Sequence, residues 1–453
     1  MKHVVIMGGG VAGLAAALRL SRSAGRSSLP PRITLLEASP KLGGRVYSFA
    51  HALSDSPLDN GQHVLMGCCV AAIEYLREVG HEQNVERLRG LALPFFRADG
   101  ARSRLEAGTL PHPLGMVQAF LRYDMLSLPD RLRILRVALR LRSMKETDLA
   151  ALDAMSCEAW LRSMGQSPAA IDYFWHPVIL ATLNADHERA SAKLLAVVLR
   201  EIFLSTPEAA DVLLPAAPLG ELFIDPAAHL LELRGVELRL HAPAETLRID
   251  GDRCIGVEMK DGAFLEADAV MSAMPAWALR RVLEQTEAST ALQVKYDSFL
   301  PSEILSVHFW TSRDLDAGSM SGLLDTKLQW LFAKGRESDG RYRYSCTVSA
   351  AGDDVPRSAG ELRPLLLEEL RLICPDLAGD ELLDLLPLRE KRATFVPAAG
   401  LEVVRPCAET AIQGLFLAGD WTATGFPATI EGAIRSGYAA AESILTLFAG
   451  NQS

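Results

Sequence analysis

The sequence predicts an α/β protein in which a parallel sheet begun near the N-terminus is completed near the C-terminus. Residues 4–7 read as a short apolar strand, the glycine-rich turn 8–13 follows, and an alanine- and leucine-rich stretch then favours a helix. Further apolar strands are expected at 33–36 and 415–417. With 453 residues the chain is too long to fold around a single hydrophobic core. We therefore expect a Rossmann-type nucleotide-binding domain interleaved with a second domain of mixed sheet and helices.

The turn after the first strand has the Gly-x-Gly-x-x-Gly spacing of a dinucleotide site. Gly8 permits the tight turn, Gly10 lets the backbone approach a pyrophosphate, and Gly13 allows the helix to pack closely on the strand. Val11 and Ala12 open that helix, whose amide donors and positive dipole end favour phosphate. An ordinary glycine-rich loop is the alternative, but the strand before the motif and the helix after it favour dinucleotide binding.

An acid follows at the end of the second strand. Glu37 stands 24 residues after Gly13, where an acid holds the ribose diol of a bound dinucleotide. Its charge disfavours a 2′-phosphate, so NADP is not expected. We assign the neighbouring Ala38 to the same site.

Composition excludes several classes of protein. The net charge of −10 and the absence of nucleic-acid-binding signatures argue against a nucleic-acid partner. Seven cysteines without a Cys-x-x-Cys pair predict free thiols in a reducing compartment and no metal site. No uncharged run reaches the ~18 residues of a spanning helix, and the apolar N-terminus is already assigned to the first strand. We therefore expect a cytoplasmic protein, with a peripheral position on the inner face of the cytoplasmic membrane as a further option.

The segment after Glu37 makes the cofactor more specific. Gly43, Gly44 and Arg45 form a Gly-Gly-Arg-x-x-Ser stretch, and the chain resembles the GG-doublet flavoprotein superfamily, which includes amine oxidases, protoporphyrinogen oxidases and carotenoid desaturases. The resemblance implies a GR2-like FAD-binding domain, with FAD in place of NAD. In that superfamily the doublet lets the backbone lie along the cofactor.

The C-terminal part supplies the matching half of the resemblance. The resemblance implies that Gly419 and Asp420 lie at the ribityl chain of the FAD. It also implies that the helix beginning near Thr429 and Ile430 points its amides at the flavin N1/C2 region, where negative charge accumulates on reduction. For Glu431 a role as a partner of its own helix's dipole is the alternative to a catalytic one.

Two further segments are placed by the same resemblance. Residues 58–65, including Gly61 and Gln62, are expected to cross beneath the flavin. The backbone near Thr246 is expected to meet the adenine. The predicted FAD-binding domain comprises 1–67, 220–275 and 386–453, and the substrate domain comprises 68–219 and 276–385.

One stretch is basic although the chain as a whole carries a net negative charge. Residues 116–145 contain six arginines and one lysine against only Asp124 and Asp130, interleaved with apolar residues. A basic amphipathic helix of this type can lie in a membrane interface. The alternative is a solvated surface helix packed on its own domain.

A finer resemblance is to the hydroxysqualene dehydroxylases, a family within the superfamily. The residues that carry it are spread over most of the chain, at 58–63, 175–184, 188–191, 391–395 and 427–433. The resemblance implies a prenyl-lipid substrate and reductive removal of the allylic hydroxyl of hydroxysqualene, giving squalene. An allylic hydroxyl leaves readily only when it is protonated or strongly hydrogen-bonded, so the site needs an acid beside apolar surface.

Four residues are candidates for the chemistry. Asp59 and His63 are the candidate acids, with a cap of the Asn60-Gly61 turn and a satisfied core histidine as their respective alternatives. Trp175 is a candidate shield for a cationic intermediate, or a core aromatic. Asn184 either donates to the departing oxygen or holds a turn.

The direction of electron flow is not fixed by the motifs. No second Gly-x-Gly-x-x-Gly unit with a following acid is visible, so an external electron donor is expected. A carotenoid-type desaturase or an amine or protoporphyrinogen oxidase is the first alternative. A non-catalytic flavin-binding lipid carrier is the second.

Overall fold

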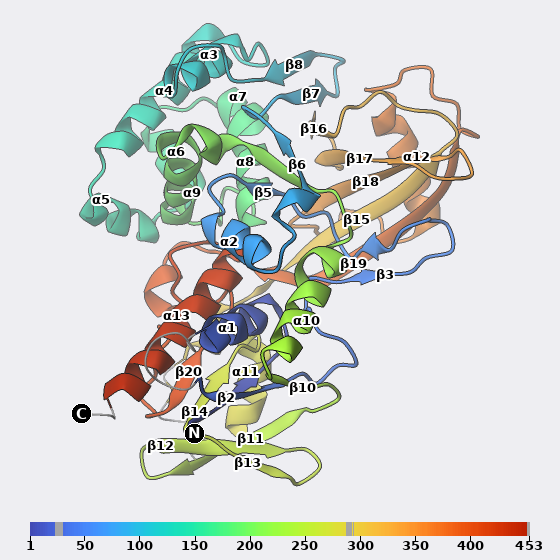
Figure 1. Cartoon of the computed structure of the whole chain (residues 1–453). Coiled ribbons are helices and arrows are strands. Elements are labelled where there is room, and N and C mark those ends of the chain that lie inside the picture. The colour runs from blue at the N-terminus through green and yellow to red at the C-terminus, as the bar shows by residue number, and fades with distance from the viewer. Residues whose placement is uncertain (23–29, 287–291, 293, 451–453) are drawn as a thin grey trace.

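The structure is a computed structural model that describes residues 1–22, 30–286, 292 and 294–450 (Figure 1). Its first sheet has five strands, and every neighbouring pair is parallel. The spatial order is β10 (Glu237–Arg239), β2 (Arg32–Leu36), β1 (His3–Met7), β14 (Ala269–Ser272) and β20 (Leu415–Leu417). The sheet thus joins three distant parts of the chain, which confirms the predicted interleaving.

Four helices cover one face of this sheet. They are α1 (Val11–Ser21), α2 (Val70–Glu78), α10 (Asp225–Leu233) and α13 (Ile430–Gly450), and their apolar residues form one core with the sheet. Helices α1 and α13 approach closely, because a Cβ at Gly437 would lie 2.2 Å from the Ala12 carbonyl oxygen.

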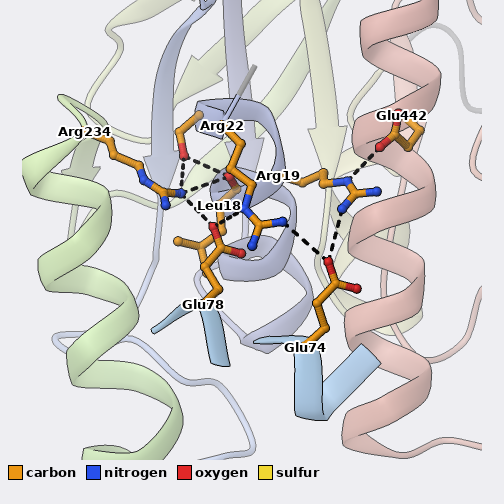
Figure 2. Close-up of polar contacts among 8 residues, drawn as sticks. Leu18, Arg19, Arg22, Glu74, Glu78, Arg234 and Glu442 are labelled. Atoms are coloured by element: carbon orange, nitrogen blue, oxygen red, sulfur yellow. Dashed lines mark hydrogen bonds and ion pairs between the residues drawn. The ribbon is translucent and has the colours of Figure 1, made fainter. Parts of the chain in front are cut away.

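Ion pairs connect these helices, as Figure 2 shows. The carboxylate of Glu78 accepts hydrogen bonds from Arg22 at 2.6 Å and from Arg234 at 2.8 Å. Arg19 reaches Glu442 of α13 at 2.7 Å. One cluster therefore holds α1, α2, α10 and α13 together.

The other face of the first sheet is covered by different elements. Helix α11 (Ala276–Glu284) and a three-stranded sheet share a core with the sheet residues Val5 and Met7. The strands of the small sheet are β11 (Ala244–Asp250), β12 (Arg253–Met259) and β13 (Phe264–Glu266).

A seven-stranded sheet forms the second domain. Its order is β19 (Leu382–Phe395), β15 (Pro301–Thr311), β18 (Tyr342–Ser349), β17 (Trp330–Arg336), β16 (Met320–Leu324), β7 (Leu93–Arg97) and β8 (Arg102–Leu105). All pairings are antiparallel except that of β16 with β7. Helix α12 (Ala359–Leu370) packs on one apolar face. Along β15 the side chains alternate, so Ser306 and His308 face the opposite side.

Helices complete the second domain. They are α3 (Leu114–Arg122), α4 (Leu128–Ser143), α5 (Glu146–Ala151), α6 (Cys157–Ser163), α7 (Pro168–Ala170), α8 (His176–Leu183) and α9 (Ala192–Leu204), with a π-helical turn η4 (Ile171–Trp175) before α8. Short strands connect the domains: β3 (Ser48–Phe49), β4 (Leu58–Asp59), β5 (Leu65–Met66), β6 (Val85–Leu88) and β9 (Val212–Pro215). A second π-helical turn, η6 (Gly220–Ile224), precedes α10, and the 3₁₀ turns are η2 (Glu82–Asn84), η3 (Leu152–Ala154), η5 (Pro207–Ala210), η8 (Tyr296–Ser298) and η9 (Glu402–Val404).

The domain boundaries differ from those expected. Residues 386–395 belong to β19 and pair with β15, so they lie in the second domain. Helix α2 shares the core of α1 and α13, which extends the first segment of the nucleotide-binding domain beyond residue 67. Helix α11 packs on the parallel sheet, which moves the boundary expected at residue 275 beyond residue 284. No helix within the described ranges is long and apolar enough to cross a membrane.

Candidate active site

The predicted nucleotide residues gather at the carboxyl edge of the parallel sheet. Gly8 follows β1, Glu37 follows β2, and Gly419 and Asp420 come shortly after β20. Ligands of open parallel sheets bind beyond this edge. The fold therefore brings Gly8 and Asp420, which are 412 positions apart in the chain, to the same edge.

The three motif glycines have different neighbours. Gly8 has a φ of +110°, and a Cβ at Gly13 would lie 2.0 Å from the Gly8 carbonyl oxygen. Gly10 has an ordinary φ of −74°, and a Cβ there would have the Gly43 carbonyl oxygen, 3.9 Å away, as its nearest contact. Gly8 and Gly13 thus serve the fold, whereas Gly10 borders open space.

That open space adjoins the start of α1. Gly10 is the N-cap and offers no side chain to the first amides of the helix, at Val11 and Ala12. The first amides of a helix have no partner inside the helix and attract anions. This arrangement fits a pyrophosphate.

Glu37 is held by two backbone amides. Its Oε2 accepts from the Gly9 amide and its Oε1 from the Ser39 amide, both at 2.8 Å. Each carboxylate oxygen has a further acceptor position. The oriented carboxylate fits a ribose diol, and Ala38 beside it is exposed.

The glycine doublet lies against the motif turn. The Gly43 amide donates to the Gly9 carbonyl at 2.8 Å, and Gly43 pairs with Gly10 as a parallel bridge. Gly43 has a φ of +108°, and a Cβ there would lie 2.2 Å from the Val46 carbonyl oxygen. Glycine is therefore required at 43 by the turn itself.

Arg45 joins the two ends of the chain. Its guanidinium donates to Asp420 at 2.7 Å and to the Ala393 carbonyl at 3.0 Å. The Asn60 amide donates to the Arg45 carbonyl at 3.0 Å. One carboxylate oxygen of Asp420 is thus fixed by Arg45, and the ribityl contact of Asp420 stays a proposal.

The start of α13 is capped by its own threonine. Thr429 Oγ1 accepts from the Gly432 amide at 3.1 Å, just before the helix begins at Ile430. One of the two expectations for Glu431 made it no more than a partner of its own helix's dipole. Its carboxylate also accepts hydrogen bonds from the Ala71 and Ala72 amides at the start of α2. Its buried carboxylate therefore also caps a second helix.

Thr246 lies on β11, and its hydroxyl bonds to the Thr286 hydroxyl at 2.7 Å, on the side of α11. The segment directly beside Glu37 is 239–242, because the Glu37 amide donates to the Arg239 carbonyl and the Ala242 amide donates to the Glu37 carbonyl. The contact of the backbone near Thr246 with adenine stays a prediction.

Residues 59–63 cross the polar face of the seven-stranded sheet. His308 Nε2 lies 3.0 Å from the Asp59 carbonyl oxygen, and a Cβ at Gly61 would lie 3.4 Å from Ser306 Oγ. The Gln62 amide bonds to the neighbouring His63 carbonyl at 3.2 Å. This places the predicted crossing segment between the two domains.

Several buried polar atoms at this crossing have no hydrogen-bond partner among the described residues. They are Asn60 Oδ1, Ser306 Oγ, Ser345 Oγ and His308 Nδ1. Native proteins rarely leave buried polar atoms unpaired, so unpaired atoms point to a missing polar ligand. Together with the open side of Gly10, they fit an extended polar cofactor such as a flavin nucleotide.

Asp59 has a structural task at this crossing. Its Oδ1 accepts from Ser48 Oγ and from the Leu219 amide, each at 2.7 Å, which ties the β3–β4 hairpin to the segment before α10. It is therefore not a cap of its own turn. Burial lowers the pKa of His63, and the Asp59 charge opposes that shift.

A third charged residue lies here that the sequence motifs do not reveal. Burial lowers the pKa of Lys334 on β17 to about 8, the Asp59 charge raises it, and Arg343 lowers it further. Lys334 also acts electrostatically on His63 and His308. Its place directly after the apolar run 330–333 is the only signal in the sequence, and it is a weak one because the Lys334 side chain is half-buried.

The side chains of the other two catalytic candidates, Trp175 and Asn184, are engaged in hydrogen bonds within the protein. Trp175 lies in the helical core and its indole NH donates to Gln166 at 2.8 Å. Asn184 ends α8 with a φ of +49°, and its amide bonds both Thr394 Oγ1 and the Ala350 amide. These contacts favour the packing and turn alternatives for both residues.

One group in the described chain has the composition of a metal site. Ligand atoms of Glu158, His187 and Glu188 lie within 4.8 Å of one another. Arg162 pairs with Glu158, and His176 bonds His187 through their Nδ1 atoms at 2.9 Å. These contacts account for the cluster without an ion.

Comparison with known proteins agrees with this geometry. The chain matches the model of the flavin containing amine oxidoreductase family over residues 11–445. A hydroxysqualene dehydroxylase from Rhodopseudomonas palustris is 31% identical over 454 residues, covering 98% of each chain. A 15-cis-phytoene desaturase from Solanum lycopersicum is 23% identical over 98% of this chain and 77% of its own. The crystal structure of an oxidoreductase from Methanosarcina mazei has the same fold, with a TM-score of 0.72 at 17% identity over 98% of this chain and 100% of that one. The chain therefore belongs to the flavin-containing amine oxidoreductases and, within them, to the group of the hydroxysqualene dehydroxylases.

Proposed function

We propose that this chain is an FAD-dependent oxidoreductase that removes the allylic hydroxyl of hydroxysqualene and releases squalene and water. The observation that carries the proposal is the half-buried Lys334 on β17, whose ammonium interacts electrostatically with Asp59 and His63 of the segment that crosses between the domains. Reductive loss of a hydroxyl needs a proton donor there. The name of the relative from Rhodopseudomonas palustris supports the same reaction.

FAD is the form of flavin that the nucleotide residues fit. The start of α1 would hold the pyrophosphate, and Glu37 the ribose of the adenosine half. Asp420, oriented by Arg45, would meet the ribityl chain. When bound in its reduced form, FAD supplies a hydride.

The residues of the chain supply the acid. Lys334, with a pKa of about 8, is protonated at neutral pH and can give its proton to the leaving hydroxyl. The carbon–oxygen bond breaks, water departs, and a hydride forms the new carbon–hydrogen bond. Asp59 favours the charged form of Lys334, and His63 is the second proton carrier in this proposal.

Each turnover consumes two electrons. The chain has no second dinucleotide motif, so we assign their supply to an external donor. The substrate is a prenyl lipid, and we place the enzyme in the cytoplasm, at the inner face of the cytoplasmic membrane.

The test is anaerobic addition of hydroxysqualene to the FAD-loaded protein after its flavin has been reduced with one equivalent of dithionite, so that no reductant is left over. Mass spectrometry should show squalene, and the flavin should return to its oxidised form as substrate is added. A reduced flavin that hydroxysqualene leaves unchanged would refute the dehydroxylase. A Gly10→Val protein is the control for conversion by dithionite alone.

Carotenoid-type desaturation is the second candidate function, because the phytoene desaturase from Solanum lycopersicum matches 98% of this chain. A desaturase would act in the opposite redox direction. Phytoene would then reduce the oxidised flavin in the absence of dithionite, and an amine or porphyrinogen oxidase would respond to its own substrate in the same way. A lipid carrier would bind flavin and lipid with no change of either.

A further inference from the structure

Helix α4 has apolar residues on two opposite sides. Ile134, Val137 and Leu141 are buried against the domain. At 3.6 residues per turn, Leu128, Leu132 and Leu139 lie on the other side, where they are 58%, 52% and 69% exposed. A surface helix needs one apolar stripe to pack on its own domain. The second stripe is therefore not explained by folding.

Neighbouring leucines extend this surface. Leu110 and Leu114 near the start of α3 and Leu121 near its end are also exposed. Six of the fifteen exposed large apolar residues in the described chain thus lie between residues 110 and 139. Scattered exposed leucines need no explanation, but such a concentration marks an interaction surface.

Cations flank the exposed leucines. Arg122, Arg136 and Arg142 are exposed and have no acidic partner within the described ranges. Arg140 has only a distant one, Asp148 at 3.9 Å. By helical geometry, Arg136 and Arg140 lie on one side of the stripe and Arg142 on the other. In a chain of net charge −10, this surface is locally basic.

We propose that the leucine–arginine face, made of Leu114, Leu121, Leu128, Leu132 and Leu139 with Arg122, Arg136, Arg140 and Arg142, docks on an anionic phospholipid bilayer. The leucines enter the boundary of the acyl chains, and the arginines meet anionic headgroups. Figure 1 shows α3 and α4 at the end of the molecule remote from β11–β13, where they can meet a flat surface.

A second copy of the chain fits this face less well. A symmetric dimer through the face would bring its arginines close to those of the partner, without acids to offset them. The inference concerns a surface and does not depend on the identity of the substrate.

The experiment is flotation of the flavin-loaded full chain with vesicles. One set contains phosphatidylcholine alone and the other phosphatidylcholine mixed with phosphatidylglycerol. We expect binding to the mixed vesicles, weakened by salt, and little binding to the neutral ones. No binding to either, or equal binding to both, would overturn the proposal.

Two variants test the face itself. Leu128→Ser/Leu132→Ser/Leu139→Ser should reduce binding at least about tenfold, because the apolar contact is lost. Arg136→Gln/Arg142→Gln should reduce it about fivefold per arginine. The matched control Leu233→Ser/Leu300→Ser/Leu383→Ser changes three exposed leucines elsewhere and should bind as the unchanged protein does.

Flavin absorbance and thermal unfolding establish that each variant is folded. The arginine variant changes only exposed, unpaired side chains, so it tests the proposal even if the leucine variant fails to fold. Unchanged vesicle binding by the arginine variant would overturn the proposal. So would a leucine-dependent dimer in solution that does not float, which would assign the face to self-association.

Discussion

Lys334 is the residue on which the proposed chemistry depends. It is half-buried on β17, and desolvation lowers its pKa to about 8, below the ordinary lysine value of 10.5. A proton donor must be protonated to act, so turnover should be constant below that pKa and fall as pH rises through it.

Replacing Lys334 by Gln should lower kcat at least about a hundredfold while flavin stays bound, because general acids contribute roughly 10²–10⁴-fold. The fall of the rate near pH 8 should vanish with it. The pH dependence of kcat, measured with the flavin spectrum, checks this. Lys327→Gln, which removes an exposed lysine paired with Asp354, is the control, and an unaltered alkaline limb in the Lys334 variant would exclude Lys334 as the acid.

Asp59→Asn tests the influence of the neighbouring charge. The amide oxygen of Asn can still accept from Ser48 and the Leu219 amide, so the local structure should survive. The loss of the negative charge should lower the pKa of Lys334 further and shift the fall of the rate to lower pH, with slower turnover at pH 8. An unchanged profile would leave Asp59 with only its structural contacts.

Single residues were predictable where local geometry dictates them. Gly13 and Gly43 are required by contacts with Gly8 and Val46, which are near them in sequence, and such patterns are visible without a structure. Lys334 carries no motif, because the partners that matter to it come from β4 and β18.

At the scale of elements, different glycines of the turn after β1 are expected to be needed for folding and for cofactor binding. Gly10→Val should give a folded protein without flavin, because an added Cβ has no protein atom closer than the Gly43 carbonyl oxygen at 3.9 Å, while the side chain would block the approach of a pyrophosphate. Gly13→Val should instead destabilise the fold, since its Cβ would collide with the Gly8 carbonyl. Thermal unfolding and flavin absorbance separate the two outcomes. A yellow Gly10→Val protein would contradict the assigned cradle.

Strands and helices with a clear period were predicted well, and β19 was not. The strands expected at 4–7, 33–36 and 415–417 correspond to β1, β2 and β20, and the helix expected after the glycine turn corresponds to α1. Strand β19 contains Pro387 and a run of charged residues, which usually argue against a strand. It lies at the edge of its sheet, where a proline needs no second partner, and only the tertiary pairing with β15 reveals it.

At the scale of the whole molecule, the ion-pair cluster of Figure 2 joins four helices from distant parts of the chain. The Glu78 side chain is 2% exposed and binds two arginines. Glu78→Gln should lower the free energy of unfolding by about 1–3 kcal/mol, since charged hydrogen bonds are lost inside the protein.

Glu442→Gln is the matched control in the same cluster. Glu442 is 55% exposed, and exposed ion pairs contribute about 1 kcal/mol or less. Denaturant unfolding of both variants checks the difference. Equal losses would show that burial does not determine the strength of this cluster.

The interleaved sheet also bears on how the protein is made. Strand β20 and helix α13 leave the ribosome long after β1, yet β20 completes the sheet that β1 begins. A nascent chain that already displays its glycine turn therefore lacks Asp420 and the start of α13. Capture of the cofactor must await the synthesis of these two elements, and nonsense truncations that remove them should yield apoprotein.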